Sequence, residues 1–73
     1  MIRVIAHGII REALGAKEIY FPLPDPPIVE TLIKQLKLTG VVGLVIVNGE
    51  YKHNQSILKP NDEVNLYPIL EGG

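Results

Sequence analysis

The chain has 73 residues, 47% of them hydrophobic and 21% charged, with no cysteine and a formal net charge of −1. This length allows one small domain, and the lack of cysteine excludes disulfides and thiolate metal sites, so a hydrophobic core must hold the fold. Lys and Arg are scattered rather than clustered, which excludes a nucleic-acid partner. The longest apolar run, Val41 to Val47, is far shorter than the roughly 20 residues that span a bilayer, which excludes a membrane partner.

The first part of the chain has the pattern of two strands. Residues 2–7 and 17–23 alternate apolar and polar side chains, as in strands with one buried face. Pro22 has no N–H to donate to a sheet, so the second strand is expected at an edge. Residues 9–16 between them are expected to form a connection that turns at Gly15.

A helix is predicted next. Asp25 is placed to cap its start, and prolines are tolerated in a first helical turn. Five apolar residues then recur at helical spacing and predict one buried face: Ile28, Val29, Leu32, Ile33 and Leu36. Gly40 is expected to end the helix in the left-handed conformation.

The second part of the chain predicts three more strands. Residues 44–47 are apolar without alternation, which indicates a central strand buried on both faces. Asn48-Gly49 is typical of a tight hairpin turn and leads into a short strand over residues 50–52. A turn over residues 59–62 precedes a last strand over residues 63–68.

The sequence ends in Gly72-Gly73, beyond this last strand. Glycine has no Cβ, so such a segment can enter a channel too narrow for any side chain. The α-carboxylate of Gly73 has an ordinary pKa of about 3.3–3.7 and is an anion at neutral pH, so it must be activated before acyl chemistry. A merely frayed end is the simpler alternative. We predict a folded domain over residues 1–68 and a flexible tail over residues 69–73.

Several short motifs, in order along nearly the whole chain, resemble the MoaD/ThiS group of sulfur carriers. They are Arg11-Glu12-Ala13-Leu14-Gly15, Val47-Asn48-Gly49-Glu50, Leu58 with Asp62-Glu63-Val64, and Pro68 ahead of Gly72-Gly73. The order of the elements is that of the same group. We therefore expect an α+β, ubiquitin-like β-grasp fold, with a mixed sheet of four to five strands and one main helix packed across it.

The resemblance implies a carrier protein, not an enzyme. Gly73 would be adenylated by a separate ubiquitin-activating-type enzyme and converted to a thiocarboxylate. Gly72, which has no side chain, would let the end of the chain enter a narrow active site. No cofactor would be bound, and the partner would use the ATP, since the chain has no Walker-type phosphate loop. The chain looks more similar to the small subunit of molybdopterin synthase than to the thiamin-pathway carrier, and that role implies the large subunit of the synthase as a second partner.

Three alternative functions stay open. Small archaeal modifiers share the same motifs and join their terminal glycine to lysines of target proteins. A thiamin-pathway sulfur carrier and a β-grasp interaction module without covalent chemistry are the other two. For each of these functions we expect a cytoplasmic protein, because the lack of cysteine fits a reducing compartment.

The predicted partner-binding residues surround the start of the tail. Pro68, Ile69, Leu70 and Glu71 lie between the last strand and the glycine pair. Ile69 and Leu70 are apolar where the core no longer reaches, although one of them could still pack on the domain. Leu44 or Val47 is expected beside them on an exposed sheet face. Glu71 places a negative charge where the family often has a small residue.

The sequence offers no convincing catalytic or metal site. His7 and His53 have no cysteine or carboxylate at metal-ligand spacing and are expected on the surface or in loops. Asp62 and Glu63 are adjacent, so in a strand they would face opposite sides and could not act as a carboxylate pair. Asp62 is expected to shape a turn.

Overall fold

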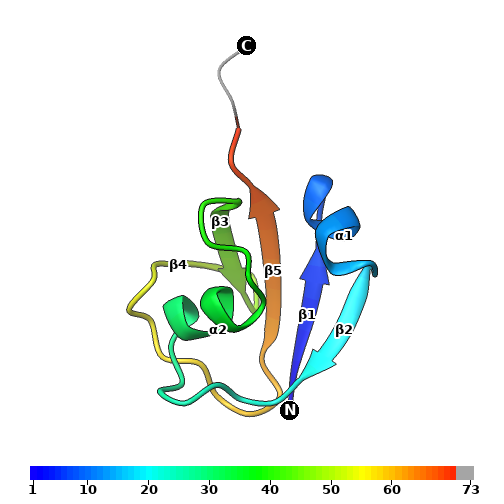
Figure 1. The fold of residues 1–73 in the computed structure, drawn as a ribbon. Helices are drawn as coiled ribbons and strands as arrows, with labels where there is room; N and C mark the ends of the chain where they lie inside the picture. Colours follow the sequence, from blue (N-terminus) through cyan, green and yellow to red (C-terminus); the bar gives the residue numbers. More distant parts are fainter. Residues whose placement is uncertain (71–73) are drawn as a thin grey trace.

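A five-stranded mixed sheet and two helices make up the computed structural model, which describes residues 1–70 (Figure 1). The elements are β1 (Ile2–Ala6), α1 (Ile9–Leu14), β2 (Glu18–Phe21), α2 (Val29–Gln35), β3 (Val42–Val47), β4 (Glu50–Lys52) and β5 (Glu63–Pro68). Across the sheet the order is β2-β1-β5-β3-β4, with β1 parallel to β5 and the other neighbours antiparallel. The predicted ubiquitin-like β-grasp fold is confirmed, including the position of β2 at an edge.

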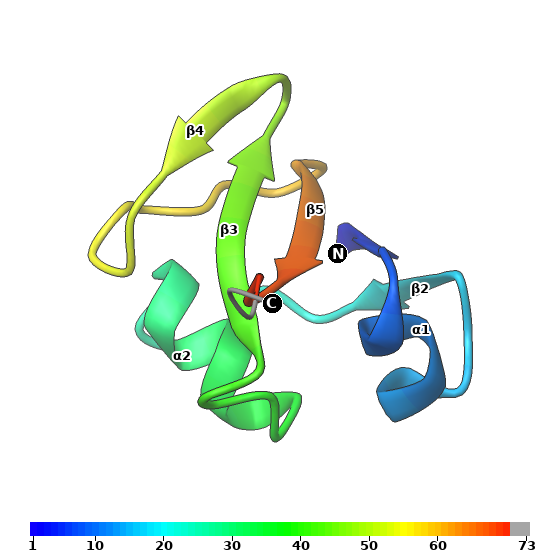
Figure 2. The ribbon, with the colours of Figure 1, turned by 90° about the horizontal axis from the view of Figure 1, so that it is seen from above.

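Both helices lie on the same side of the curved sheet, and the other side is uncovered (Figure 2). The core fills the space between the sheet and α2. Along each strand the buried core residues occupy alternate positions, because successive side chains of a strand point to opposite faces of the sheet. The fully or almost fully buried side chains are Ile2, Val4, Ala6, Ile10, Val29, Leu32, Ile33, Leu38, Val45, Val47, Leu58, Val64 and Leu66. Every one of them is apolar, so hydrophobic burial is the main source of stability.

The segment predicted as a connection contains a short helix. Helix α1 covers six residues, and its Ile10 side chain is completely buried. Gly15 ends it with φ 73°, and its N–H donates to the carbonyl of Arg11 at 2.9 Å. A helix this short is not stable alone, so its formation depends on the burial of Ile10 rather than on a repeating pattern.

Both predicted ends of the main helix are wrong. The residue at the start of α2 is Ile28, with no side-chain cap, rather than Asp25. Gly40 is left-handed as predicted, with φ 83°, but the helix ends before it, where Lys37 takes the left-handed conformation with φ 61°. The N–H of Leu38 then donates to the carbonyl of Ile33 at 3.0 Å, which closes a Schellman motif and directs Leu38 into the core. Neither α1 nor α2 is long and apolar enough to cross a membrane.

Strand β3 is buried on one face only, contrary to the prediction. Val45 and Val47 are buried under α2, whereas Leu44 and Ile46 are half-buried on the uncovered face. The reason is the position of the helices, which cover one side of the sheet. Val47 therefore belongs to the core, and its predicted place on an exposed face is wrong.

Two of the motifs that carry the family resemblance meet in space. The side chain of Asn48 donates to Asp62 Oδ1 at 2.8 Å and accepts from the N–H of Glu63 at 2.9 Å. Asp62 Oδ2 accepts from the N–H of Lys59 at 2.8 Å, so Asp62 shapes its turn as predicted. Asn48 has φ 51°, which fits the predicted tight turn between β3 and β4. These contacts fasten the beginning of β5 to the end of β3.

Candidate functional site

The candidate site is the place where the chain leaves the sheet, called here the tail root and formed by Pro68, Ile69 and Leu70. Pro68 is the last residue of β5 and pairs with Val42 of β3. The N–H of Ile69 donates to the carbonyl of Val41 at 3.0 Å, so the chain follows β3 for one residue beyond the strand. Residues 71–73, which contain the predicted Glu71, Gly72 and Gly73, lie outside the described residues.

Two glycines allow the chain to take this path. Gly8 follows β1 with φ 57°, and a Cβ there would lie 3.1 Å from Cγ of Pro68. A Cβ on Gly43 would lie 2.7 Å from Cα of Ile69, a distance that real Cβ atoms essentially never show. The register between β3 and β5 shifts at this same position, between Val42 and Leu44. The tail root thus passes over two positions that lack a side chain.

Sequence reasoning missed the role of Gly43. Gly43 lies within the apolar run from Val41 to Val47, and a glycine inside a strand is a known sign of a bulge or of a close backbone approach. Gly8 directly follows the first predicted strand, over residues 2–7. Its proximity to Pro68 depends on the parallel pairing of β1 with β5, and sequence spacing alone does not give that pairing.

The apolar residues of the tail root are exposed to different degrees. Leu70 is 92% exposed, whereas Ile69 is 49% exposed because one side of it lies against Gly43. Of the two predicted anchors, Ile69 therefore packs partly on the domain and Leu70 does not. This matches the alternative that one of the pair stays in contact with the fold.

An open apolar hollow of about 560 Å³ lies beside the tail root. It is lined by Val42, Gly43, Leu44, Tyr67, Pro68, Ile69 and Leu70. The predicted neighbour Leu44 is among them, on the uncovered face of the sheet. None of these residues carries a carboxylate, an amine or an imidazole, and the phenol of Tyr67 is the one polar side-chain group among them, so the hollow is suited to an apolar group.

His7 supports this hollow from the side. Its ring stacks on Tyr67, with ring centroids 4.1 Å apart and planes 4° from parallel. Its Nε2 lies 2.9 Å from Oδ1 of Asn65, a distance at which Nε2–H donates to the amide oxygen. The stack holds Tyr67 in place one residue before the tail root. Among residues 1–70, no three His, Cys, Asp or Glu side chains come together as metal ligands would.

The clearest electrostatic effect lies away from the tail root, on β1 and β2. Arg3 Nη2 donates to Glu18 Oε2 at 3.0 Å. This hydrogen bond, together with the positive charge of Arg3, holds the pKa of Glu18 below its usual value. The pair fastens the edge strand β2 to the sheet and has no contact with the hollow.

Several solved structures have a similar fold. A Pyrococcus furiosus protein described as molybdopterin converting factor subunit 1 is 25% identical, with a TM-score of 0.79 over 94% of this chain and 97% of that one. The Haloferax volcanii HVO 2177 protein is 22% identical, with a TM-score of 0.83 over 99% and 85%. The small archaeal modifier protein 1 of Methanosarcina acetivorans is 20% identical, with a TM-score of 0.66 over 99% and 95%.

No family model and no curated protein matches the sequence. The resemblance to the MoaD/ThiS ubiquitin-like group is nevertheless confirmed, because the structural neighbours include a molybdopterin converting factor subunit and small archaeal modifier proteins. The identity to these structures is 18–25%, and the chain shares their fold over 94–99% of its length. The likeness supports the fold more strongly than any particular chemistry.

Proposed function

We propose that this protein is a sulfur carrier whose terminal glycine, Gly73, is adenylated by a partner enzyme and converted to a thiocarboxylate. The carboxylate oxygen of Gly73 would attack the α-phosphate of ATP, which releases pyrophosphate and leaves an acyl adenylate. A sulfur nucleophile would then displace AMP. The thiocarboxylate would deliver its sulfur in the synthesis of molybdopterin, with the large subunit of molybdopterin synthase as the second partner.

One observation carries this proposal: a β-grasp domain similar to a molybdopterin converting factor subunit directs its last strand into an exposed apolar tail root. Such a root gives an activating enzyme a surface to hold while the residues after Leu70 enter its active site. Adenylation and sulfur transfer would be carried out by the partners, and this chain would supply the terminal glycine and the surface that they hold.

The test is intact mass spectrometry of the purified full chain. The protein is incubated with ATP, a sulfur donor and the activating enzyme from the same organism. A mass gain equal to one sulfur in place of one oxygen supports the proposal, and a variant lacking Gly73 is expected to show no gain. An unchanged mass under all these conditions contradicts the proposal and favours an interaction module without covalent chemistry.

A protein modifier is the second candidate, because two small archaeal modifier proteins share the fold over 99% of this chain. In that case the activated carboxyl group of Gly73 would form an isopeptide bond with a lysine amine. Digested cellular proteins would then carry branched glycine remnants on lysines. Finding these remnants, with no thiocarboxylate on the free protein, would favour the modifier over the sulfur carrier.

A further inference from the structure

Strand β3 has unequal neighbours on its two sides. It pairs with β5 from Val42 to Val47, but with β4 only from Val45 to Val47. The stretch 42–44 therefore has a strand beside it on one side only. The N–H of Val42 already donates to the carbonyl of Leu38 at 3.3 Å, so another extended segment would pair with the remaining backbone groups of this stretch, as segments do at the open edge of a sheet.

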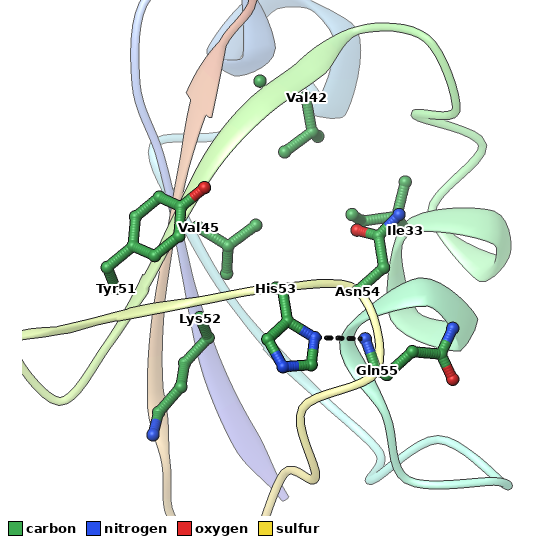
Figure 3. A pocket seen from close by; sticks show the side chains of 9 residues that line it. Ile33, Val42, Val45, Tyr51, Lys52, His53, Asn54 and Gln55 are labelled. Atoms are coloured by element: carbon green, nitrogen blue, oxygen red, sulfur yellow. Dashed lines mark hydrogen bonds between the residues drawn. The ribbon is translucent and has the colours of Figure 1, made fainter.

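Within residues 1–70 no other segment closes this edge. After β4 it turns toward the start of α2, where the N–H of Glu30 donates to the carbonyl of Asn54 at 2.9 Å and the N–H of Val29 to that of Ser56 at 3.1 Å. These bonds hold the loop against the helix and away from β3. A hollow of about 350 Å³ remains between β3, α2 and the loop (Figure 3).

The edge is flanked by a hollow on each face of the sheet. On the helix side, Ile33, Val42 and Val45 give the first hollow an apolar floor (Figure 3). On the uncovered side lies the hollow of the tail root, and both hollows include Val42 and Gly43. Since successive side chains of a strand point to opposite faces, an added strand would place alternate side chains into the two hollows.

The charges at one end of the edge indicate which segment fits. Lys52 and His53 line the helix-side hollow, and no carboxylate does. His53 Nδ1 accepts from the N–H of Gln55 at 3.1 Å, so the neutral ring carries its proton on Nε2 and can donate there. Lys52 has a partner in Glu50 at 3.2 Å, but the Glu50 side chain is 74% exposed and free to release it. An acidic residue beside Lys52 complements this end.

We propose that the 42–44 edge of β3 binds an extended segment of the protein that receives the C-terminal tail. The segment has apolar residues that alternate between the two hollows and an acidic residue next to Lys52. The tail root and this edge are continuous through Gly43, so one partner can hold both. The identity of the partner rests on the proposed function, whereas strand addition at the edge does not.

The test is an NMR titration of the ¹⁵N-labelled full chain with the acetylated and amidated peptide Asp-Asp-Val-Leu-Val-Thr. We expect the largest amide shifts at Val42, Gly43, Leu44, Lys52 and His53. A peptide with both aspartates replaced by lysines should bind about fivefold more weakly, the size of effect that one accessible charge pair gives. A peptide N-methylated at its central leucine and valine tests the backbone pairing, because each methyl group removes one N–H donor, and it should lose most of its affinity.

Two protein variants complete the test. Lys52→Glu should weaken binding of the peptide about fivefold or more, whereas Lys17→Glu, which makes the same charge change on an exposed lysine before β2, should not. Strand addition is overturned if the shifts fall elsewhere, if the N-methylated peptide binds equally well, or if no shift appears at millimolar peptide. A mass gain on Gly73 without peptide binding overturns this proposal alone, and peptide binding without a mass gain overturns only the sulfur carrier.

Discussion

Replacing Gly43 by alanine tests whether the path of the tail root depends on a missing side chain. Gly43 has no positive φ, so alanine can adopt its backbone conformation. By itself, the change from glycine to alanine would stabilise the protein by about 0.4–1 kcal/mol, because the unfolded chain loses conformational freedom. The new Cβ, however, would lie 2.7 Å from Cα of Ile69 and 3.1 Å from its backbone nitrogen.

The close contact is with backbone atoms, so no change of rotamer can relieve it. Overpacking of this kind costs about 1–3 kcal/mol. Displacing Ile69 also breaks its hydrogen bond to Val41, which costs about 0.5–1.5 kcal/mol. After the entropic gain is subtracted, we expect Gly43→Ala to lower the free energy of unfolding by about 0.5–4 kcal/mol. A central value of about 2 kcal/mol corresponds, in a domain of this size, to a fall in Tm of about 8–16 °C.

The matched control is the same substitution in a chain that stops at Pro68. Without Ile69 the contact is gone, so Gly43→Ala should raise Tm there by a few degrees. Thermal unfolding followed by circular dichroism measures all four proteins. A rise in Tm in both backgrounds, or an equal fall in both, would show that Ile69 does not rest on Gly43 and would refute the reasoning.

The other predictions concern the helix end, the strand junction, the ion pair and the tail root. Lys37→Gly should stabilise the protein by about 0.5–1 kcal/mol in urea unfolding, because Lys37 is left-handed, while Lys34→Gly inside α2 should destabilise it. Asn48→Ala should cost about 1–3 kcal/mol, since it removes two exposed hydrogen bonds, to Asp62 and from the N–H of Glu63, and places alanine in the left-handed conformation. In NMR titrations, the pKa of Glu18 should lie below its unfolded value of about 4.3. The ion pair with Arg3 therefore stabilises the fold above that pH, and this stabilisation is lost as the pH falls through the folded pKa. Arg3→Gln should return the pKa of Glu18 toward its unfolded value. Leu70→Ala should raise the KM for the activating enzyme about 5–30-fold with an unchanged Tm, as loss of an apolar anchor does, and an unchanged KM would exclude Leu70 from the interface.

The strands and the main helix could be predicted because side-chain burial is periodic. Residues such as Ile2, Val4 and Ala6 record the buried face of β1 directly in the sequence. The ends of the helix could not be predicted in the same way. Lys37 adopts a conformation that favours glycine because burial of Leu38 outweighs its local strain, and no local pattern reveals that balance.

The candidate site was predicted in part, for a related reason. Ile69 and Leu70 were identified as apolar residues beyond the last strand, and their exposure at the tail root agrees with that. The glycines beneath the tail root, the stack of His7 on Tyr67 and the free edge of β3 were not predicted. Each of them depends on which strands are neighbours, and the order β2-β1-β5-β3-β4 brings together segments that lie far apart in the sequence.

The distribution of these features suggests how the effects of substitutions should divide. The core and the contact between Asn48 and Asp62 hold the fold, so changes there should alter stability first. Leu70 is almost fully exposed and supports nothing in the described domain, so changing it should alter partner binding while stability stays constant. Gly43 belongs to both groups, because it lies inside the sheet and also carries Ile69. A variant at Gly43 should therefore lose stability and partner binding together, and this joint loss distinguishes a positioning role from a purely structural or purely interfacial one.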